Sequence, residues 1–325
     1  MSIQQIHPQN LPEKPLVSFI ITTYNLPVQM LKECLKSILA LSLNEQKREI
    51  ILVDDGSEES PMPALADFQQ YFIYIRQNNQ GLSATRNIGL RNANGCYVQF
   101  VDGDDTIIPF AYEHCLDLAR YRNADIVAFE MTQKRREKRD LTQAGPMTGS
   151  EYLNNYNIHA AACSYLFKKN ILHGLLFTLN ILHEDEEFTP QLILHADVLY
   201  KTNAEAYFYR QREESITHNH SKRAIIKKLD DTFNIIIRFQ ARIDTFPKLE
   251  QKALKRRIAQ LTMDYLFNVA RYTHSMKHMD RAIDRLNKRG LYPLPDKKYT
   301  RNYQLFRRLI QSKTGRRLII AVTLR

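Results

Sequence analysis

Three aspartates that follow an apolar stretch are the residues of this sequence best suited to chemistry. Residues 98–101 (Val-Gln-Phe-Val) have the character of a buried strand, and 102–105 (Asp-Gly-Asp-Asp) end it. In an open α/β sheet, ligands bind beyond the carboxyl ends of the strands, which is where these carboxylates would lie. Such carboxylates suit a divalent cation that is shared with substrate phosphates. The other interpretation is a simple acidic turn.

A second acidic centre lies much later in the chain. Residues 184–187 (Glu-Asp-Glu-Glu) precede an apolar run at 192–194. Acids are favoured in the first turn of a helix because the helix dipole is positive there. A carboxylate at such a place can also act as a general base. Residue types alone leave both interpretations open.

The elements that must position these acids alternate between strand and helix. Strand-like apolar runs occupy residues 16–22, 49–53, 71–75, 96–101 and 126–129. Helical patterns begin near residues 28, 82 and 109. This rhythm predicts a mostly parallel sheet with right-handed crossovers. The polar loops 22–25, 54–57 and 102–105 would then meet at one edge.

The signals between residues 130 and 218 are weaker. Residues 151–172 predict a helix, and 198–200 and 206–209 predict two closing strands. A polar loop, 210–218, follows them.

The remainder of the chain changes in character to helix and to positive charge. Residues 221–325 contain 26 Lys and Arg against 8 Asp and Glu, whereas residues 1–220 contain 20 against 27. Apolar residues from Leu254 to Val269 repeat at helical spacing and predict a helix that packs on the catalytic body or on a partner.

The last segment, 302–325, predicts a basic amphipathic helix. Tyr303, Phe306, Leu309 and Ile310 share one face, and arginines flank it. This pattern suits a helix lying on an anionic membrane surface. Docking of the same face on the protein itself fits the pattern equally well.

Composition excludes several protein classes. The chain has 325 residues, of which 44% are apolar, which indicates a globular protein. Its four cysteines lie far apart, so neither a zinc ribbon nor a disulfide framework is expected. The same spacing is what we expect of a protein in a reducing compartment. No secretory signal or run of 18 apolar residues is visible, and we expect a cytoplasmic protein.

Taken in order, five motifs resemble those of the family 2 glycosyltransferases, inverting enzymes with the GT-A fold, an α/β fold. The motifs are 17–25 (VSFIITTYN), 53–57 (VDDGS), 79–89 (NQGLSATRNIG), 101–105 (VDGDD) and 183–188 (HEDEEF). The resemblance implies a GT-A domain at 1–218, with a donor half (15–105) and an acceptor half (106–218). An all-helical, basic region would follow at 219–325.

The resemblance also implies roles for single residues. Tyr24 would stack on the nucleotide base, and Asp55 would accept the imide N–H of uracil. Asp104, assisted by Asp102, would hold Mn²⁺ or Mg²⁺, and Asp185 would be the catalytic base. The other residues expected to line the donor pocket are Thr22, Asn25, Asp54, Arg86 and Gly103. Glu184, Arg212 and His218 are further candidates for the site.

The implied activity is transfer of a sugar from a nucleotide-sugar, above all a UDP-sugar, to a saccharide or lipid-linked acceptor. Capsule, exopolysaccharide or lipopolysaccharide synthesis at the inner face of the cytoplasmic membrane would be the setting. One alternative is a sugar nucleotidyltransferase, which would release pyrophosphate. Another is a nucleic-acid-binding protein, but the basic region has no RNA-binding signature, and no nucleic acid is expected as a partner.

Overall fold

The computed structural model describes residues 14–134, 140–212 and 221–324. Its contacts divide the chain into two compact units. The first consists of Met1–Met147, Ala161–Asn180 and His195–Gln211. The second consists of Thr148–Ala160, Ile181–Leu194 and Arg212–Arg325. The second unit thus takes in Thr148–Ala160, Ile181–Leu194 and the residues from Arg212 onward of the stretch that the resemblance assigns to the acceptor half.

The first unit is built on a nine-stranded sheet with the order β3-β2-β1-β4-β8-β6-β9-β5, and β7 pairs with β9. The strands β3, β2, β1 and β4 run parallel. Antiparallel pairs join β8, β5 and β7 to the rest, while β6 and β9 are parallel. The strands are β1 (Val17–Thr23), β2 (Arg48–Asp54), β3 (Ile73–Arg76), β4 (Tyr97–Asp102), β5 (Thr106–Ile107), β6 (Ile126–Thr132), β7 (Gln143–Met147), β8 (Tyr165–Lys168) and β9 (Leu199–Phe208).

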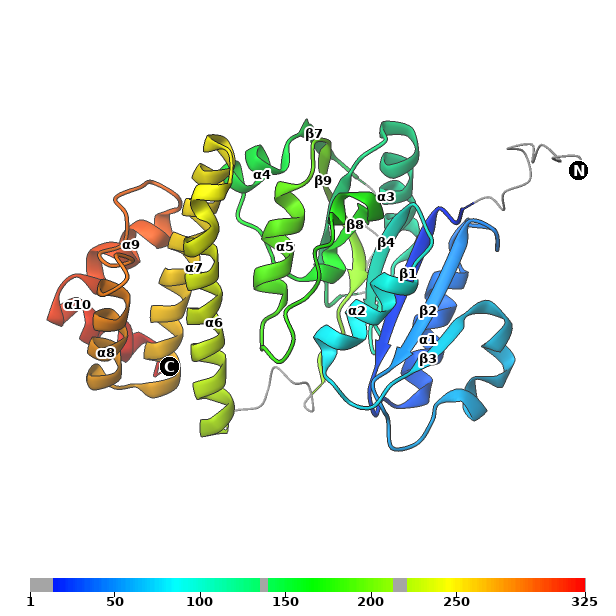
Figure 1. The fold of residues 1–325 in the computed structure, drawn as a ribbon, viewed down its shortest axis with the longest axis horizontal. Coiled ribbons are helices and arrows are strands. Elements are labelled where there is room, and N and C mark those ends of the chain that lie inside the picture. Colours follow the sequence, from blue (N-terminus) through cyan, green and yellow to red (C-terminus); the bar gives the residue numbers. More distant parts are fainter. Residues whose placement is uncertain (1–13, 135–139, 213–220, 325) are drawn as a thin grey trace, which may run out of the picture. The chain divides into compact units, whose positions relative to one another are not determined.

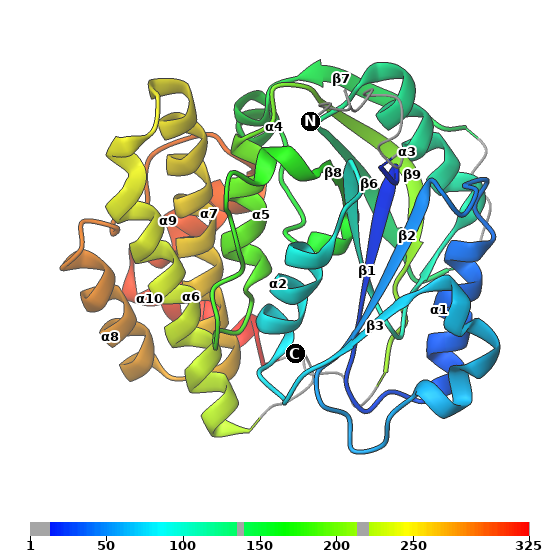
Figure 2. The ribbon, with the colours of Figure 1, turned by 45° about the vertical axis from the view of Figure 1, so that its right-hand side comes forward.

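Helices cover both faces of this sheet (Figure 2). Phe19 and Ile21 of β1 share a core with Leu35 of the first helix and Cys115 of the third. Ile20 points the other way, since strand side chains alternate, and lies directly against Gly89 of the second helix. The helices are α1 (Val28–Leu39), α2 (Leu82–Asn92) and α3 (Pro109–Arg122), with 3₁₀ turns at η2 (Met62–Tyr71), η3 (Ala162–Ser164) and η4 (Lys169–Leu172).

The register of the parallel strands sets their carboxyl ends level. Thr22 of β1 lies opposite Val53 of β2 and opposite Asp102 of β4, and Thr23 lies opposite Asp54. The polar loops that follow these strands therefore meet at one edge of the sheet, as the sequence predicts.

The predicted helix over residues 151–172 is wrong. A capping box of Thr148 and Glu151 begins a short helix, α4 (Gly149–Asn155), and the chain then leaves it. Residues 165–168 form β8 between β4 and β6, where Leu166 and Phe167 are fully buried. Their burial in the sheet outweighs the local helical pattern. The two predicted closing strands are one strand, β9, whose pairing with β6 is interrupted by register shifts.

The second unit is helical, as predicted for the region after residue 218. Figure 1 shows α6 and α7 running alongside each other. The stripe from Leu254 to Val269 lies in the core of this unit, against Phe233 and Met279. The helix that carries it, α7, also packs on α4 and α5, which lie within the predicted domain 1–218. Besides α4, the elements described in this unit are α5 (Asp185–Leu194), α6 (Lys222–Arg242), the 3₁₀ turn η6 (Ile243–Thr245), α7 (Lys248–Thr273), α8 (Met276–Asn287), α9 (Arg301–Ile310) and α10 (Lys313–Val322).

Two further features concern the chain as a whole. Within the described ranges, every helix is too short or too polar to cross a membrane. Cys34, Cys96, Cys115 and Cys163 are free thiols, in agreement with the prediction that they form no disulfide framework.

The His114 imidazole in α3 gives the fold an expected dependence on pH. Its Nε2 atom is buried and has no hydrogen-bond partner in the part of the chain that the structure describes. Burial lowers the pKa of His114 below the usual 6.5, and Asp117 opposes this shift only in part. The unfolded chain therefore binds a proton near pH 6.5 that the folded chain does not, so stability is lost as the pH falls through 6.5.

We expect His114→Gln to reduce this loss. The free energy of unfolding, measured with urea at about pH 7.5 and about pH 5.5, should fall less for the variant than for the wild type. Equal decreases in the two proteins would show that His114 does not contribute to the pH dependence.

Candidate active site

The loops after β1 and β2 are tied together by Asn25. Its backbone N–H donates to the Ser57 hydroxyl (2.9 Å), and its side-chain oxygen accepts the N–H of Glu58 (2.8 Å). Asn25 has a positive φ of 49°, a conformation that asparagine tolerates better than most residues. The neighbouring Tyr24 is 47% exposed, so its ring is available for stacking on a flat ligand.

Asp54 supports the second loop from within. Its side chain is fully buried and accepts hydrogen bonds from the Ser57 N–H (2.9 Å) and hydroxyl (2.6 Å). The Tyr74 hydroxyl donates to its other oxygen (2.7 Å). The carboxylate that the resemblance places in the donor pocket is thus engaged in shaping the loop.

Asp55 holds the start of α2. It accepts the backbone N–H groups of Gln80 (2.9 Å) and Gly81 (2.8 Å) and the side-chain amide of Gln77 (2.6 Å). Gly81 has a φ of +86°, which glycine adopts without strain. A carboxylate has about four acceptor positions, so Asp55 retains capacity for one more donor.

Arg86 and Thr22 fix the orientation of Asp102. Arg86 is 2% exposed, and its guanidinium lies against the rings of Phe100 and Phe177. It donates to Asp102 Oδ1 (3.1 Å), and the Thr22 hydroxyl lies 3.3 Å from the same oxygen. A buried cation and a hydroxyl group thus hold this carboxylate in place.

Asp102 and Asp104 fit a divalent cation that completes its shell with substrate phosphates. Both side chains are partly exposed. Gly103 between them donates to the Thr22 carbonyl (2.9 Å), and a Cβ there would lie 2.8 Å from that carbonyl oxygen, so only glycine permits this close approach. In the described parts of the chain, no three His, Cys, Asp or Glu side chains are grouped to hold a metal. Mg²⁺ and similar ions are often held by one or two carboxylates plus phosphates.

Asp105 belongs to the support of this loop. It is 1% exposed and accepts the Tyr207 hydroxyl (2.8 Å) and the Arg210 N–H (2.8 Å). Burial, followed by the charge of Asp102, raises the pKa of Asp105 to about 8. The Tyr207 hydroxyl also accepts the Asp102 N–H (3.0 Å), and the Arg210 side chain donates to the Asp104 carbonyl (2.9 Å) and to Glu33 (2.6 Å).

The second acidic centre lies in the helical unit. Asp185 is the first residue of α5 and is partly exposed. Glu187 forms a bidentate ion pair with Arg238 of α6 (2.6 and 2.7 Å), and Glu186 pairs with Arg257 of α7. Two of the acids that follow one another in sequence therefore have structural partners on neighbouring helices.

The remaining candidates differ in their placement. Glu184 is buried and its carbonyl accepts the N–H groups of Glu187 and Phe188, which places it at the start of α5. Arg212 is partly buried just after β9. His218 lies outside the described residues.

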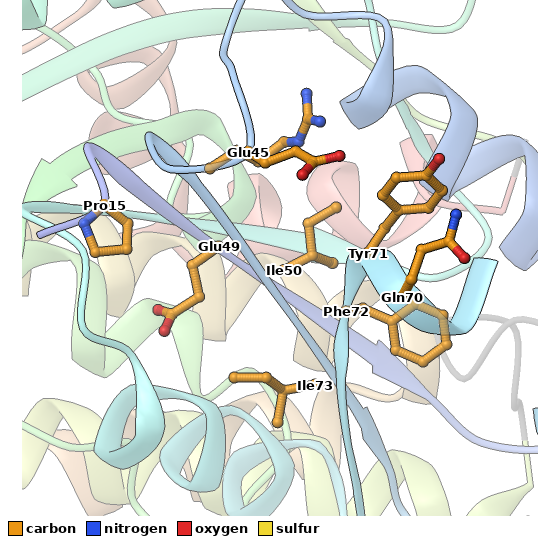
Figure 3. Close-up of a pocket in the computed structure, with 9 residues that line it drawn as sticks. Pro15, Glu45, Glu49, Ile50, Gln70, Tyr71, Phe72 and Ile73 are labelled. Atoms are coloured by element: carbon orange, nitrogen blue, oxygen red, sulfur yellow. The ribbon is translucent and has the colours of Figure 1, made fainter. Parts of the chain in front are cut away.

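A hollow of about 300 Å³ lies elsewhere, at the amino ends of β2 and β3. Figure 3 shows Glu49, Tyr71 and Ile73 among the side chains around it. Arg48 at its wall donates to the carbonyl of Leu43 (2.9 Å) and thereby supports the turn after α1. Because the polar loops follow the opposite ends of these strands, we assign the hollow no part in the site.

The residues that hold the acids in place were not predicted from the sequence. Tyr207 and Arg210 lie in or just after β9, and Arg238 and Arg257 lie in the helical unit. Each acts on an acid at least 51 positions away in sequence. A partner at such distances gives no local signal in the sequence.

Comparison with known proteins places this geometry in a family. Residues 18–174 match the family model described as Glycosyl transferase family 2. The chain is 28% identical over 242 residues to the uncharacterized glycosyltransferase EpsJ of Bacillus subtilis. The alignment covers 69% of this chain and 70% of that relative.

Solved structures share the fold. TarS 1-349 of S. aureus, in complex with UDP-GlcNAc, superposes with a TM-score of 0.69 at 17% identity, over 94% of this chain and 88% of that one. A mannosyltransferase of Pyrobaculum calidifontis, in complex with GDP-Man and Mn²⁺, gives a TM-score of 0.56 at 14% identity, over 96% and 86%. The predicted GT-A fold with a helical C-terminal region is confirmed. Residues 18–174 therefore belong to glycosyltransferase family 2, and the chain is a nucleotide-sugar glycosyltransferase.

Proposed function

We propose that this protein transfers a sugar from a UDP-sugar to a hydroxyl group of a saccharide or lipid-linked acceptor, with inversion at the anomeric carbon, in the synthesis of a cell-surface polysaccharide. One observation carries the proposal. The level register of β1, β2 and β4 gathers the exposed Tyr24 ring, the Asp55 acceptor and the Asp102 and Asp104 carboxylates at one edge of a parallel sheet.

The choice of uracil as the nucleotide base rests on Asp55. Its remaining acceptor position suits a base that presents an N–H, as the imide of uracil does, and Tyr24 supplies the stacking surface. Guanine also has an N–H donor on its pairing edge, and the two solved relatives described above contain UDP-GlcNAc and GDP-Man. We propose uracil, and a donor screen decides between the two bases.

Asp102 and Asp104 are the residues that would hold Mn²⁺ or Mg²⁺. A bound cation of this kind supplies positive charge against the negative charge that grows on the departing diphosphate. Arg86 and Thr22 keep Asp102 oriented, so this carboxylate needs little rearrangement when the donor arrives.

Asp185 is the proposed general base. The carboxylate takes the proton of the acceptor hydroxyl while that oxygen forms a bond to the anomeric carbon, and the bond to the diphosphate oxygen breaks on the opposite side. The products are the glycosylated acceptor and UDP. Glu186 and Glu187 are poorer candidates because Arg257 and Arg238 bind them.

The acceptor is proposed to be reached at the inner face of the cytoplasmic membrane. The positive charge of the region after residue 220 supports this, since anionic lipids attract basic segments.

A screen of nucleotide sugars tests the proposal. Thermal stability should rise with a UDP-sugar and Mn²⁺ together, because a ligand that binds only the folded state stabilises it. Turnover with the stabilising donor should release UDP, and the product should have the opposite anomeric configuration to the donor. Release of pyrophosphate would identify a nucleotidyltransferase, and stabilisation by GDP-sugars alone would overturn the choice of base.

A further inference from the structure

The exposed side of α9 and α10 is basic and contains no acid. Residues 301–324 include no Asp or Glu. Arg307 and Arg316 form ion pairs with Asp296 (3.0 Å) and Asp280 (2.5 Å). Four other cations of the segment are exposed, and in the described part of the chain they form no ion pair: Arg301, Arg308, Lys313 and Arg317.

Exposed aliphatic side chains lie among these cations. Leu318 and Val322 are four residues apart on α10, so they share one face, and the row formed by Lys313 and Arg317 borders it. On α9, Leu305 lies between Arg301 and Arg308 in the same way. The exposed fractions are 59% for Leu305, 52% for Leu318, 62% for Val322 and 66% for Leu324.

This surface is not the apolar face of Tyr303, Phe306 and Ile310, for which the sequence left contact with a membrane and docking on the protein itself as alternatives. Tyr303, Phe306 and Ile310 are buried in the core of the helical unit, together with Ile319 and Ile320 of α10. Gly315 allows α10 to lie close to the end of α9, because a Cβ there would collide with the Leu309 carbonyl oxygen. Because α9 and α10 pack on each other and on α7, their exposed residues are held in a fixed arrangement.

We propose that this patch, the α9–α10 surface, binds the anionic headgroups of a membrane and inserts its aliphatic side chains at the headgroup boundary. The residues of the surface are Arg301, Leu305, Arg308, Lys313, Arg317, Leu318, Val322 and Leu324. The purpose of such binding, access to a lipid-linked acceptor, rests on the proposed function, whereas the binding itself does not. Basic residues that border an apolar face are the pattern of helices that lie in a membrane interface.

Two other occupants fit the surface less well. Proteins that bind single-stranded nucleic acid stack bases on aromatic rings, and the rings of this segment, Tyr303 and Phe306, are buried. A second copy of the chain, docked through the same patch, would place cations against cations, which disfavours a self-complementary interface.

Vesicle sedimentation with the full-length protein tests the proposal. The protein should bind vesicles of phosphatidylcholine mixed with phosphatidylglycerol, should not bind phosphatidylcholine alone, and should dissociate as salt rises. Each basic residue near an anionic surface strengthens binding roughly fivefold, so the triple variant Arg308→Gln, Lys313→Gln, Arg317→Gln should bind about 100-fold more weakly.

Matched variants distinguish the contribution of this patch to vesicle binding from that of the net charge of the protein. Lys248, Lys252 and Lys255 are exposed on α7, and their replacement by Gln removes the same charge. That control should bind nearly as well as the wild type, and equal losses in the two triple variants would overturn the proposal. Leu318→Ser with Val322→Ser should weaken binding further, whereas Ile226→Ser with Leu249→Ser, 61% and 52% exposed at their sites, should not.

Three outcomes distinguish the proposal from its rivals and from the proposed function. Tighter binding to a single-stranded oligonucleotide than to vesicles, or self-association that Leu318→Ser and Val322→Ser abolish, would overturn it. UDP release in the absence of vesicles should be unchanged in all these variants. If the wild type binds vesicles but releases no UDP from any donor, the proposed function fails while the α9–α10 surface stands.

Discussion

Asp185→Asn is expected to lower kcat by about 10²- to 10⁴-fold, the usual contribution of a general base. Asparagine has nearly the same shape but does not take up the acceptor proton. The apparent affinity for the donor should change little, because the donor loops belong to the other unit. Initial rates of UDP release with acceptor present, measured over a range of donor concentrations, provide kcat and KM separately.

Glu187→Gln is the matched control for this experiment. It also removes one charge from α5, but it breaks the bidentate pair with Arg238, whose hydrogen bonds to a charged group contribute about 1.5–3 kcal/mol each. This variant should unfold at a lower temperature and retain most of its kcat per folded molecule. If Glu187→Gln lost activity as Asp185→Asn does while keeping its stability, Glu187 would be the base instead.

Asp104→Asn is expected to lower kcat/KM by roughly 10³-fold, since a divalent cation at a leaving group contributes several kcal/mol to transition-state stabilisation. The neutral amide is a weaker ligand for a hard cation than a carboxylate. The side chain is partly exposed, so folding should be unaffected.

Binding of UDP gives a readout of this change that does not depend on turnover. The wild type should bind UDP more tightly when Mn²⁺ is added, and Asp104→Asn should bind it equally with and without Mn²⁺. Asp67→Asn, at an exposed carboxylate in η2, should behave as the wild type does. A variant at residue 104 that kept the full effect of Mn²⁺ would exclude Asp104 as a ligand.

The donor half could be predicted from sequence because its signals are local. Each strand of the parallel group is a short apolar run that ends in a polar loop. The helices α1 and α2 follow directly after Pro27 and Gly81, residue types that mark a helix start in the sequence. Parallel packing then brings the loops together without further information. The family resemblance rested on the same loops, and it is confirmed.

The middle of the chain could not be predicted in this way. Tyr165, Leu166 and Phe167 fit a helical pattern and a strand equally well, and only the vacant place between β4 and β6 decides for the strand. Within this segment the chain leaves the second unit and returns to the first, since α4 belongs to the second unit and β8 to the first. A local pattern contains no information about such a change of unit.

The acids of α5 and the last two helices show a second limit of prediction from sequence. Four consecutive carboxylates look alike in sequence, and Arg238 and Arg257, 51 and 71 positions away, distinguish two of them. In α9 the amphipathic pattern was correct, but it does not reveal whether the apolar face meets lipid or the protein itself. Tyr303 and Phe306 are buried, so this face meets the protein itself, and only the opposite face of α9 is free to meet lipid.

The bonds from Tyr207 and Arg210 to the aspartate loop have a consequence for the order in which the protein is made. These residues contact Asp105 across 102 and 105 positions of sequence. At the usual speed of roughly 5–20 residues per second, a ribosome needs about 5–20 s to synthesise the intervening chain. During that time β1 to β4 can pair, while the aspartate loop still lacks the two side chains that hold it. The nascent chain should thus gain the loops that we propose to bind the nucleotide base before the proposed metal loop is held in place.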